Sequence, residues 1–161
     1  MAALSLFFAL LLAGSAIHKV VAHNRLAAVA GRLTGLRAQG QLALIVAGTM
    51  EATAAVCLLV APLHALGALL ACALWAFYAT ALLRRRGETL DCGCDLVARE
   101  KPVDWPLIAR PAVLALGVLI ASTLPAASIS IDTPFAAAGL LALYLAAAEL
   151  LAIPHPRWRS S

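Results

Sequence analysis

Charged side chains are scarce in this sequence, and their scarcity decides its class. Only 12% of the 161 residues are Asp, Glu, Lys or Arg, whereas soluble globular chains contain about 25% of them. Aromatic residues are also few, at 6%, while hydrophobic residues make up 63%. So few charges cannot cover a folded domain with a surface that water wets. A soluble globular protein is therefore excluded, and most of the chain must lie in lipid.

Long polar segments are missing as well. A helix needs about 20 apolar residues to cross a hydrocarbon core of roughly 30 Å, and apolar runs of about that length occur repeatedly. They cover residues 2–22, 41–63, 65–83, 107–125 and 134–153. The polar stretches that remain are too short for a second domain. We predict an all-α fold, a single polytopic membrane domain over residues 1–161 with about five transmembrane helices.

The first run lacks the positively charged start of a secretory signal. Ala13–Ala16 offers a cleavage site of small residues, but Met1–Leu4 contains no Lys or Arg, which a signal would need. We therefore expect residues 2–22 to stay as a membrane span.

Lysine and arginine are absent from every second connection between the predicted spans. Most of the 12 basic residues fall in the first loop, the third loop or the C-terminal tail: Arg25, Arg32, Arg37, Arg84, Arg85, Arg86, Arg99, Lys101, Arg157 and Arg159. The net charge of +4 therefore reports orientation rather than a nucleic acid partner. By the positive-inside rule, a protein of the bacterial inner membrane with this pattern has its N-terminus outside and its C-terminus in the cytoplasm.

The first loop has a helical pattern of its own. Its recurring apolar residues are Leu26, Val29, Leu33 and Leu36. Their spacing predicts a short amphipathic helix on the inner membrane surface, broken at Gly35 and Gly40.

The second and third spans are joined only through Pro62–His64, which predicts a tight antiparallel hairpin. Cys57 and Cys72 lie at similar depth on its two arms, so a second thiol pair between the helices is one interpretation. The other is that both are small packing residues, because free cysteines are commonly buried.

Few ionisable residues lie within the spans, where a charge costs about 2.5–3.5 kcal/mol on insertion scales. Glu51 falls near mid-membrane and must be protonated, hydrogen-bonded or paired. Lys19, Arg110 and Glu149 lie in a shallower layer, and by depth Glu149 suits either cation better than Glu51 does. The alternatives to a functional role are snorkelling of Lys19 and Arg110 to the interface and a purely structural hydrogen bond at Glu51.

A Cys-x-x-Cys pair is absent, but Cys92-Gly93-Cys94 places two cysteines one residue apart in the third loop. The glycine gives the backbone the freedom that a disulfide there would need, and strained or exposed disulfides exchange readily. A redox pair, a metal site and a structural turn all stay open. His18 and His23 could join the cysteines at a soft metal, yet no familiar ligand spacing supports this, so we predict no metal site.

Three blocks of the sequence resemble the MauE family, membrane proteins of methylamine utilisation that are grouped with the DoxX-like redox-associated membrane proteins. They are Ala16–Lys19 in the first span, Glu51 in the second, and Asp91–Cys94 followed by Val103–Arg110 before the fourth. In the family the cysteine pair is usually followed by Phe-Gly or Gly-Gly, and the arginine by Asn. Asp95-Leu96 and Pro111 stand there instead, a departure that concerns the shape of the loop.

The resemblance implies a DoxX-like or DsbB-like four-helix core plus one helix, and an accessory role. MauE-type proteins are required for maturation of periplasmic methylamine dehydrogenase, whose small subunit is rich in disulfides, alongside the thioredoxin-like MauD. Thiol–disulfide exchange through Cys92 and Cys94 with a MauD-like partner follows by analogy. The supporting residues would be Lys19, Glu51, Arg110 and Glu149. The orientation inferred above, however, puts the cysteine pair on the cytoplasmic side and the client on the other.

Two other functions fit the pattern. A quinone-coupled disulfide generator of the DsbB or vitamin K epoxide reductase kind is also a helical bundle with cysteines near the membrane surface, and bound quinone would identify it; otherwise no cofactor is expected. A non-redox scaffold or chaperone would tolerate the loss of both cysteines. Whether the chain is an enzyme, a thiol–disulfide oxidoreductase, depends on which of these functions it has.

Reporter fusions test the orientation. We expect green fluorescent protein fused after Arg159 to fluoresce and alkaline phosphatase fused there to be inactive, because the basic loops should face the cytoplasm. An active phosphatase would reverse the orientation.

Overall fold

The computed structural model describes residues 2–35, 37–90, 101–124 and 130–150, and within them the fold is a bundle of long helices. Five are long and apolar enough to cross a membrane: α1 (Ala2–Val21), α3 (Gly40–Leu59), α4 (His64–Arg84), α5 (Trp105–Thr123) and α6 (Thr133–Leu150). A helix bonds its backbone internally, as a chain in lipid must. The all-α bundle expected from the sequence is confirmed, and it fits a multi-pass membrane protein.

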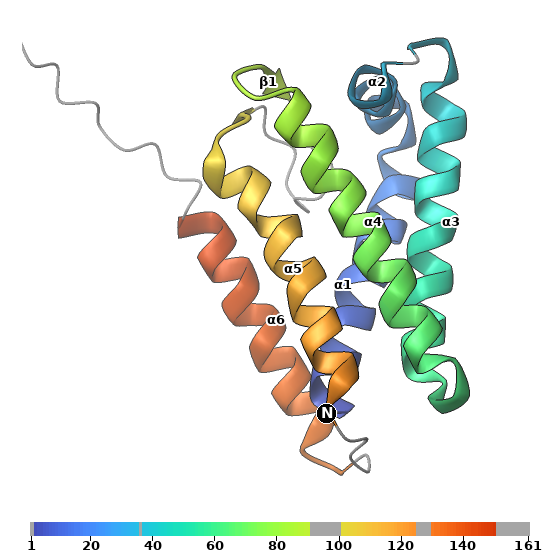
Figure 1. The fold of residues 1–161 in the computed structure, drawn as a ribbon, viewed down its shortest axis with the longest axis vertical. Helices are drawn as coiled ribbons and strands as arrows, with labels where there is room; N and C mark the ends of the chain where they lie inside the picture. The colour runs from blue at the N-terminus through green and yellow to red at the C-terminus, as the bar shows by residue number, and fades with distance from the viewer. Residues whose placement is uncertain (1, 36, 91–100, 125–129, 151–161) are drawn as a thin grey trace, which may run out of the picture.

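Consecutive long helices run in opposite directions (Figure 1). The N-terminal end of α1, the turn η2 (Ala61–Leu63) and the start of α6 lie at one end of the bundle. The other end carries α2 (His23–Thr34) and the short strands β1 (Thr89–Leu90) and β2 (Lys101–Pro102). The predicted placement of the first loop and the described part of the third loop on one side is therefore confirmed.

Helix α1 packs against α3 and α6, while α4 packs against α3 and α5. Two aromatic residues of α1 join these contacts. The ring of Phe8 lies 5.6 Å from that of Trp75 on α4 and contacts the backbone at Gly117 of α5, where a Cβ would stand 3.3 Å away. The ring of Phe7 meets Tyr144 of α6 edge-on at 6.2 Å. The core thus centres on the N-terminal half of α1.

Helix α2 lies across the end of the bundle and is seen nearly end-on in Figure 1. The side chain of Leu26 in α2 is buried, and Gly35 ends α2 in the left-handed conformation at φ 76°. The predicted amphipathic helix and its break at Gly35 are therefore confirmed. Gly40 does not break α2 but begins α3, where a Cβ would stand 2.1 Å from the carbonyl oxygen of Ala27. Glycine at position 40 lets α2 and α3 meet. Leu36, also part of the predicted apolar pattern, lies outside the described residues.

The predicted hairpin of α3 and α4 closes through η2. Its two helices approach most closely at Gly67 of α4. A Cβ at this position would lie 2.6 Å from the backbone nitrogen of Leu58 and 2.8 Å from the carbonyl carbon of Cys57. Small residues allow such approach where lipid supplies no hydrophobic drive, so the hairpin depends on this glycine.

We expect Gly67→Val to destabilise the bundle by about 1–3 kcal/mol, because overpacking a close contact displaces the backbone. Thermal unfolding in lipid nanodiscs measures the change. Gly139→Val on α6 is the matched control, since no atom lies within 4 Å of a Cβ placed there. Equal stability of the two variants would contradict the close packing of α3 on α4.

Candidate functional site

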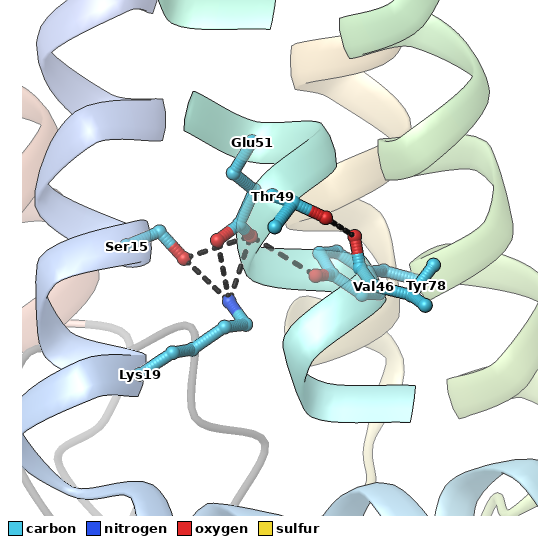
Figure 2. Close-up of polar contacts among 6 residues, drawn as sticks. All are labelled: Ser15, Lys19, Val46, Thr49, Glu51 and Tyr78. Atoms are coloured by element: carbon cyan, nitrogen blue, oxygen red, sulfur yellow. Dashed lines mark hydrogen bonds and ion pairs between the residues drawn. The ribbon is translucent and has the colours of Figure 1, made fainter. Parts of the chain in front are cut away.

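A buried ion pair lies inside the bundle, between α1 and α3. The Nζ atom of Lys19 is 2.7 Å from Oε1 and 2.8 Å from Oε2 of Glu51 (Figure 2). The side chain of Glu51 is 1% exposed and that of Lys19 is 9% exposed. The expectation that Glu51 lies inside the bundle with a polar partner is confirmed.

Two hydroxyl groups complete the surroundings of this pair. The Ser15 hydroxyl donates to Glu51 Oε1 at 2.9 Å and accepts from Lys19 Nζ at 2.8 Å. The Tyr78 hydroxyl, from α4, donates to Glu51 Oε1 at 2.9 Å. An ammonium group has three N–H donors, and here they face three acceptor oxygens. We call Ser15, Lys19, Glu51 and Tyr78 the buried network, and it connects α1, α3 and α4.

The direction of side chains explains why Lys19 and Glu51 meet although they start at different depths. A side chain on a helix leans toward the N-terminus of that helix. Because α1 and α3 are antiparallel, Lys19 leans toward mid-membrane and Glu51 leans back toward the end that carries α2. The expectation from depth alone, that Glu149 suits Lys19 better, is wrong, and Lys19 does not snorkel to the interface.

A small cavity lies beside the buried network, and it reaches all five long helices. It has a volume of about 50 Å³, and its wall includes Glu51 of the network, Arg110 of α5 and Tyr144 of α6. This volume holds a few water molecules. We call it the central cavity. It brings Glu51 and Arg110, which lie far apart in the sequence, to one site.

Arg110 also fastens α5 to α6. Its Nη2 atom donates to the carbonyl oxygen of Ala148, in the last turn of α6. Carbonyl groups in the last turn of a helix have no partner within the helix, and a cation there also suits the helix dipole. Glu149 is the next residue of the same turn.

The described ends of the α4–α5 connection are paired with each other. Strand β1 pairs antiparallel with β2, with Thr89 opposite Pro102 and Leu90 opposite Lys101. The amide of Val103 donates to the Glu88 carbonyl at 2.8 Å, and the amide of Gly87 donates to the Val103 carbonyl at 3.1 Å. We call Gly87–Leu90 together with Lys101–Asp104 the loop base.

Side chains anchor the loop base to the two helices. The Arg86 guanidinium, in the turn after α4, lies 4.4 Å from the centroid of the Trp105 ring at the start of α5, a cation–π contact. The Asp104 carboxylate accepts a hydrogen bond from the Leu107 amide at 3.2 Å and so caps the start of α5. Val103 is 2% exposed and packs in a small core with Leu82, Leu107 and Ile108.

The predicted redox pair, Cys92 and Cys94, falls within residues 91–100, outside the described residues. Cys57 and Cys72 are described, and both are free thiols. The Cβ of Cys57 lies 3.0 Å from the Cβ position at Gly67, and Cys72 is five residues further along α4, about 7.5 Å along the axis. A disulfide needs Cα atoms within about 4.4–6.8 Å, so the geometry favours packing roles over a second thiol pair.

Metal ligands do not gather in the part of the chain that the structure describes. No group of three His, Cys, Asp or Glu side chains there could hold a metal ion. The Nε2 atom of His18 is buried without a hydrogen-bond partner among those residues. The Nδ1 atom of His23 lies 3.3 Å from the carbonyl oxygen of Val20.

Sequence reasoning missed Ser15 and Tyr78. A signal for Ser15 existed, because a residue four positions before Lys19 shares its helix face. For Tyr78 no such signal existed, since its place opposite Glu51 depends on how α4 is rotated against α3.

Comparison with known proteins gives two matches. A family profile described as methylamine utilisation protein MauE matches residues 1–125. The methylamine utilization protein MauE of Paracoccus denitrificans is 36% identical over 162 residues, covering 92% of this chain and 85% of that protein. No solved structure matches the chain significantly. The profile match includes Lys19, Glu51, Tyr78 and Arg110.

We expect Glu51→Ala to destabilise the protein by about 3–5 kcal/mol, because it leaves a buried ammonium without its partner. The double variant Lys19→Met, Glu51→Leu should lose less than the sum of the two single changes. Unfolding in nanodiscs measures both. Thr49→Ala is the control, since the Thr49 hydroxyl donates to the Val46 carbonyl of its own helix at 2.9 Å (Figure 2). Strict additivity would contradict a direct stabilising interaction.

Proposed function

Because this chain belongs to the MauE family of membrane proteins involved in methylamine utilisation, we propose that it assists the maturation of methylamine dehydrogenase by thiol–disulfide exchange. Cys92 and Cys94 carry the exchange. A MauD-like thioredoxin-fold protein is the redox partner, and the disulfide-rich periplasmic enzyme is the client.

The loop base is the observation that supports this proposal most directly. Backbone pairing of β1 with β2 joins Leu90 to Lys101, so both ends of the segment that contains the cysteines are attached at one place. Cys92 follows Leu90 by two residues. Reactive residues in proteins commonly lie on loops that a rigid scaffold positions. Attaching both ends of a loop limits the conformations that the loop can adopt, which lowers the entropy that binding a partner costs.

The exchange proceeds in two balanced steps. A client thiolate attacks one sulfur of the Cys92–Cys94 disulfide, which forms a mixed disulfide and releases the other cysteine as a thiolate. The second client thiolate then attacks the mixed disulfide, so the client gains a disulfide and this protein becomes a dithiol. The disulfide form of the thioredoxin-fold partner accepts the two electrons and restores the starting state. The two protons that the client thiols give up are taken up by Cys92 and Cys94 and then pass, with the two electrons, to the dithiol of the partner.

The buried network supports this chemistry by holding together the helices on which the loop base depends. It holds α4 against α1 and α3 through Tyr78, while Arg86 and Arg110 attach α5 to α4 and α6. The two helices that bear the loop base are therefore both fastened to the bundle. In this role Lys19, Glu51 and Arg110 position the loop and do not touch the reacting sulfurs.

The side of the membrane is part of the proposal. By the positive-inside count the loop base faces the cytoplasm, whereas the client is periplasmic. The attack of a client thiolate on the Cys92–Cys94 disulfide applies to the inverted orientation, in which the pair meets the client directly. With the loop base in the cytoplasm, the pair would instead relay electrons across the bilayer.

A quinone-coupled disulfide generator is the second candidate, and the central cavity favours it. Trp75, Tyr78 and Tyr144 bring aromatic rings to this cavity and Arg110 brings N–H donors. In that reaction the dithiol gives two electrons and two protons to the quinone, which leaves a disulfide and a quinol. The cavity has room for a few water molecules, so a quinone ring would have to part the helices. For this reason we prefer a protein partner.

The test replaces Cys92 and Cys94 by serine, singly and together, in cells that produce the client. We expect client disulfides to be lost in all three variants at normal membrane levels, because each exchange needs both sulfurs. A single variant should trap a mixed disulfide that identifies the partner. Cys72→Ser is the matched control and should leave client oxidation unchanged.

Three results would change the assignment. Normal client oxidation in the double variant would establish the non-redox scaffold instead. Quinol formation by the purified protein with a dithiol and a quinone, lost in the double variant, would establish the quinone-coupled reaction. Loss of client oxidation in Cys72→Ser would move the reactive pair into the bundle.

A further inference from the structure

A second cavity lies where α2 crosses α3 and α4, and its lining is apolar. It has a volume of about 70 Å³ and is partly open to the outside of the bundle. Its walls include Val29 and Leu33 from α2, Ala43 and Ala47 from α3, and Phe77 and Ala81 from α4. We call it the α2 cavity. The small side chains of α3 leave the space that α2 covers.

The polar groups on the wall of the α2 cavity are already engaged. The three N–H groups of Lys19 face Ser15 and both carboxylate oxygens of Glu51. The Tyr78 hydroxyl donates to Glu51, and the Thr34 hydroxyl donates to the Ala30 carbonyl at 2.8 Å. An occupant therefore finds apolar surface and engaged polar groups, which suits a hydrocarbon chain.

The position of the cavity points to the membrane as the source of that chain. Helices α3 and α4 are long and apolar enough to span a bilayer, and α2 lies across their ends (Figure 1). An amphipathic helix in this position lies at the boundary of headgroups and acyl chains. A cavity beneath it is at the depth where the acyl chains begin.

The two helices that form the cavity with α3 carry exposed basic residues at this end of the bundle. Helix α2 contains no Asp or Glu, and its Arg25 and Arg32 are exposed. Arg84 is exposed at the end of α4. Arg85 joins the two helices, because its Nη2 atom donates to the Arg32 carbonyl at 2.7 Å while its Nη1 atom pairs with Glu88 at 3.2 Å.

We propose that the α2 cavity binds one acyl chain of an anionic phospholipid, whose headgroup lies against Arg32 and Arg84. Clusters of basic residues beside a membrane span attract anionic headgroups. Because about 70 Å³ is far less than a whole acyl chain occupies, only a few methylene groups of the chain enter the cavity, beside the apolar parts of Lys19 and Tyr78. The rest of the chain lies along the outside of the bundle, to which the cavity is open. A lipid bound in the folded state alone also stabilises that state by mass action.

The test is native mass spectrometry of the protein released from nanodiscs that contain equal amounts of phosphatidylglycerol and phosphatidylcholine with the same chains. We expect a retained adduct with the mass of phosphatidylglycerol. Arg32→Gln and Arg84→Gln should each lower its preference over phosphatidylcholine, by roughly fivefold per arginine. Ala47→Phe should remove the adduct by filling the cavity.

Ala28→Phe is the control for added bulk, because Ala28 is exposed on α2 and away from the cavity lining; it should retain the adduct. The arginine variants change exposed side chains, so they test the proposal even if Ala47→Phe fails to fold. An unchanged preference in both arginine variants overturns the headgroup site. An adduct that persists in folded Ala47→Phe overturns the cavity as its site, and an adduct with an isoprenoid mass overturns the phospholipid.

Discussion

The pairing of Lys19 with Glu51 is the interaction on which the arrangement of the bundle depends. In lipid there is no water to solvate a lone charge, so each residue requires the other at hydrogen-bonding distance. That requirement fixes how far α1 and α3 slide past each other and how each is rotated. The hydrogen bond from the Tyr78 hydroxyl to Glu51 constrains the position and rotation of α4 in the same way. Two charges and two hydroxyl groups thus set the geometry of three helices whose other buried contacts are apolar.

Helices α5 and α6 are attached by arginine contacts near the membrane surface. Helix α5 is held at the end that bears the loop base, by Arg86 on Trp105 and by Arg110 on the last turn of α6. Both arginines act near the membrane surface rather than at its centre. Polar contacts therefore concentrate at the end of the bundle that carries α2 and the loop base. The opposite end relies on aromatic contacts of Phe7 and Phe8 and on the hydrogen bond between Ser5 and His64 at 2.8 Å.

The spans and their common ends could be predicted because each depends on the chain alone: apolar length defines a span, and short connections force antiparallel neighbours. The short surface helix was predictable for the same reason, from its spacing and Gly35. Contacts between helices were harder. Depth counted from the Cα atoms misassigned Lys19, because a long side chain can shift its charge along the helix axis. The roles of Gly40, Gly67 and Tyr78 depend on how the helices are rotated against each other, which a sequence rich in alanine and leucine does not reveal.

The order of synthesis gives the buried ion pair a further consequence. Lys19 leaves the ribosome 32 residues before Glu51, which at about 5–20 residues per second is an interval of roughly 2–6 s. During that interval α1 has no carboxylate to receive its ammonium, so the side chain must extend to the interface, where water solvates it. Arrival of α3 lets the ammonium turn inward. We therefore expect Lys19 to extend to the interface in the nascent chain and to pair with Glu51 once α3 is in place.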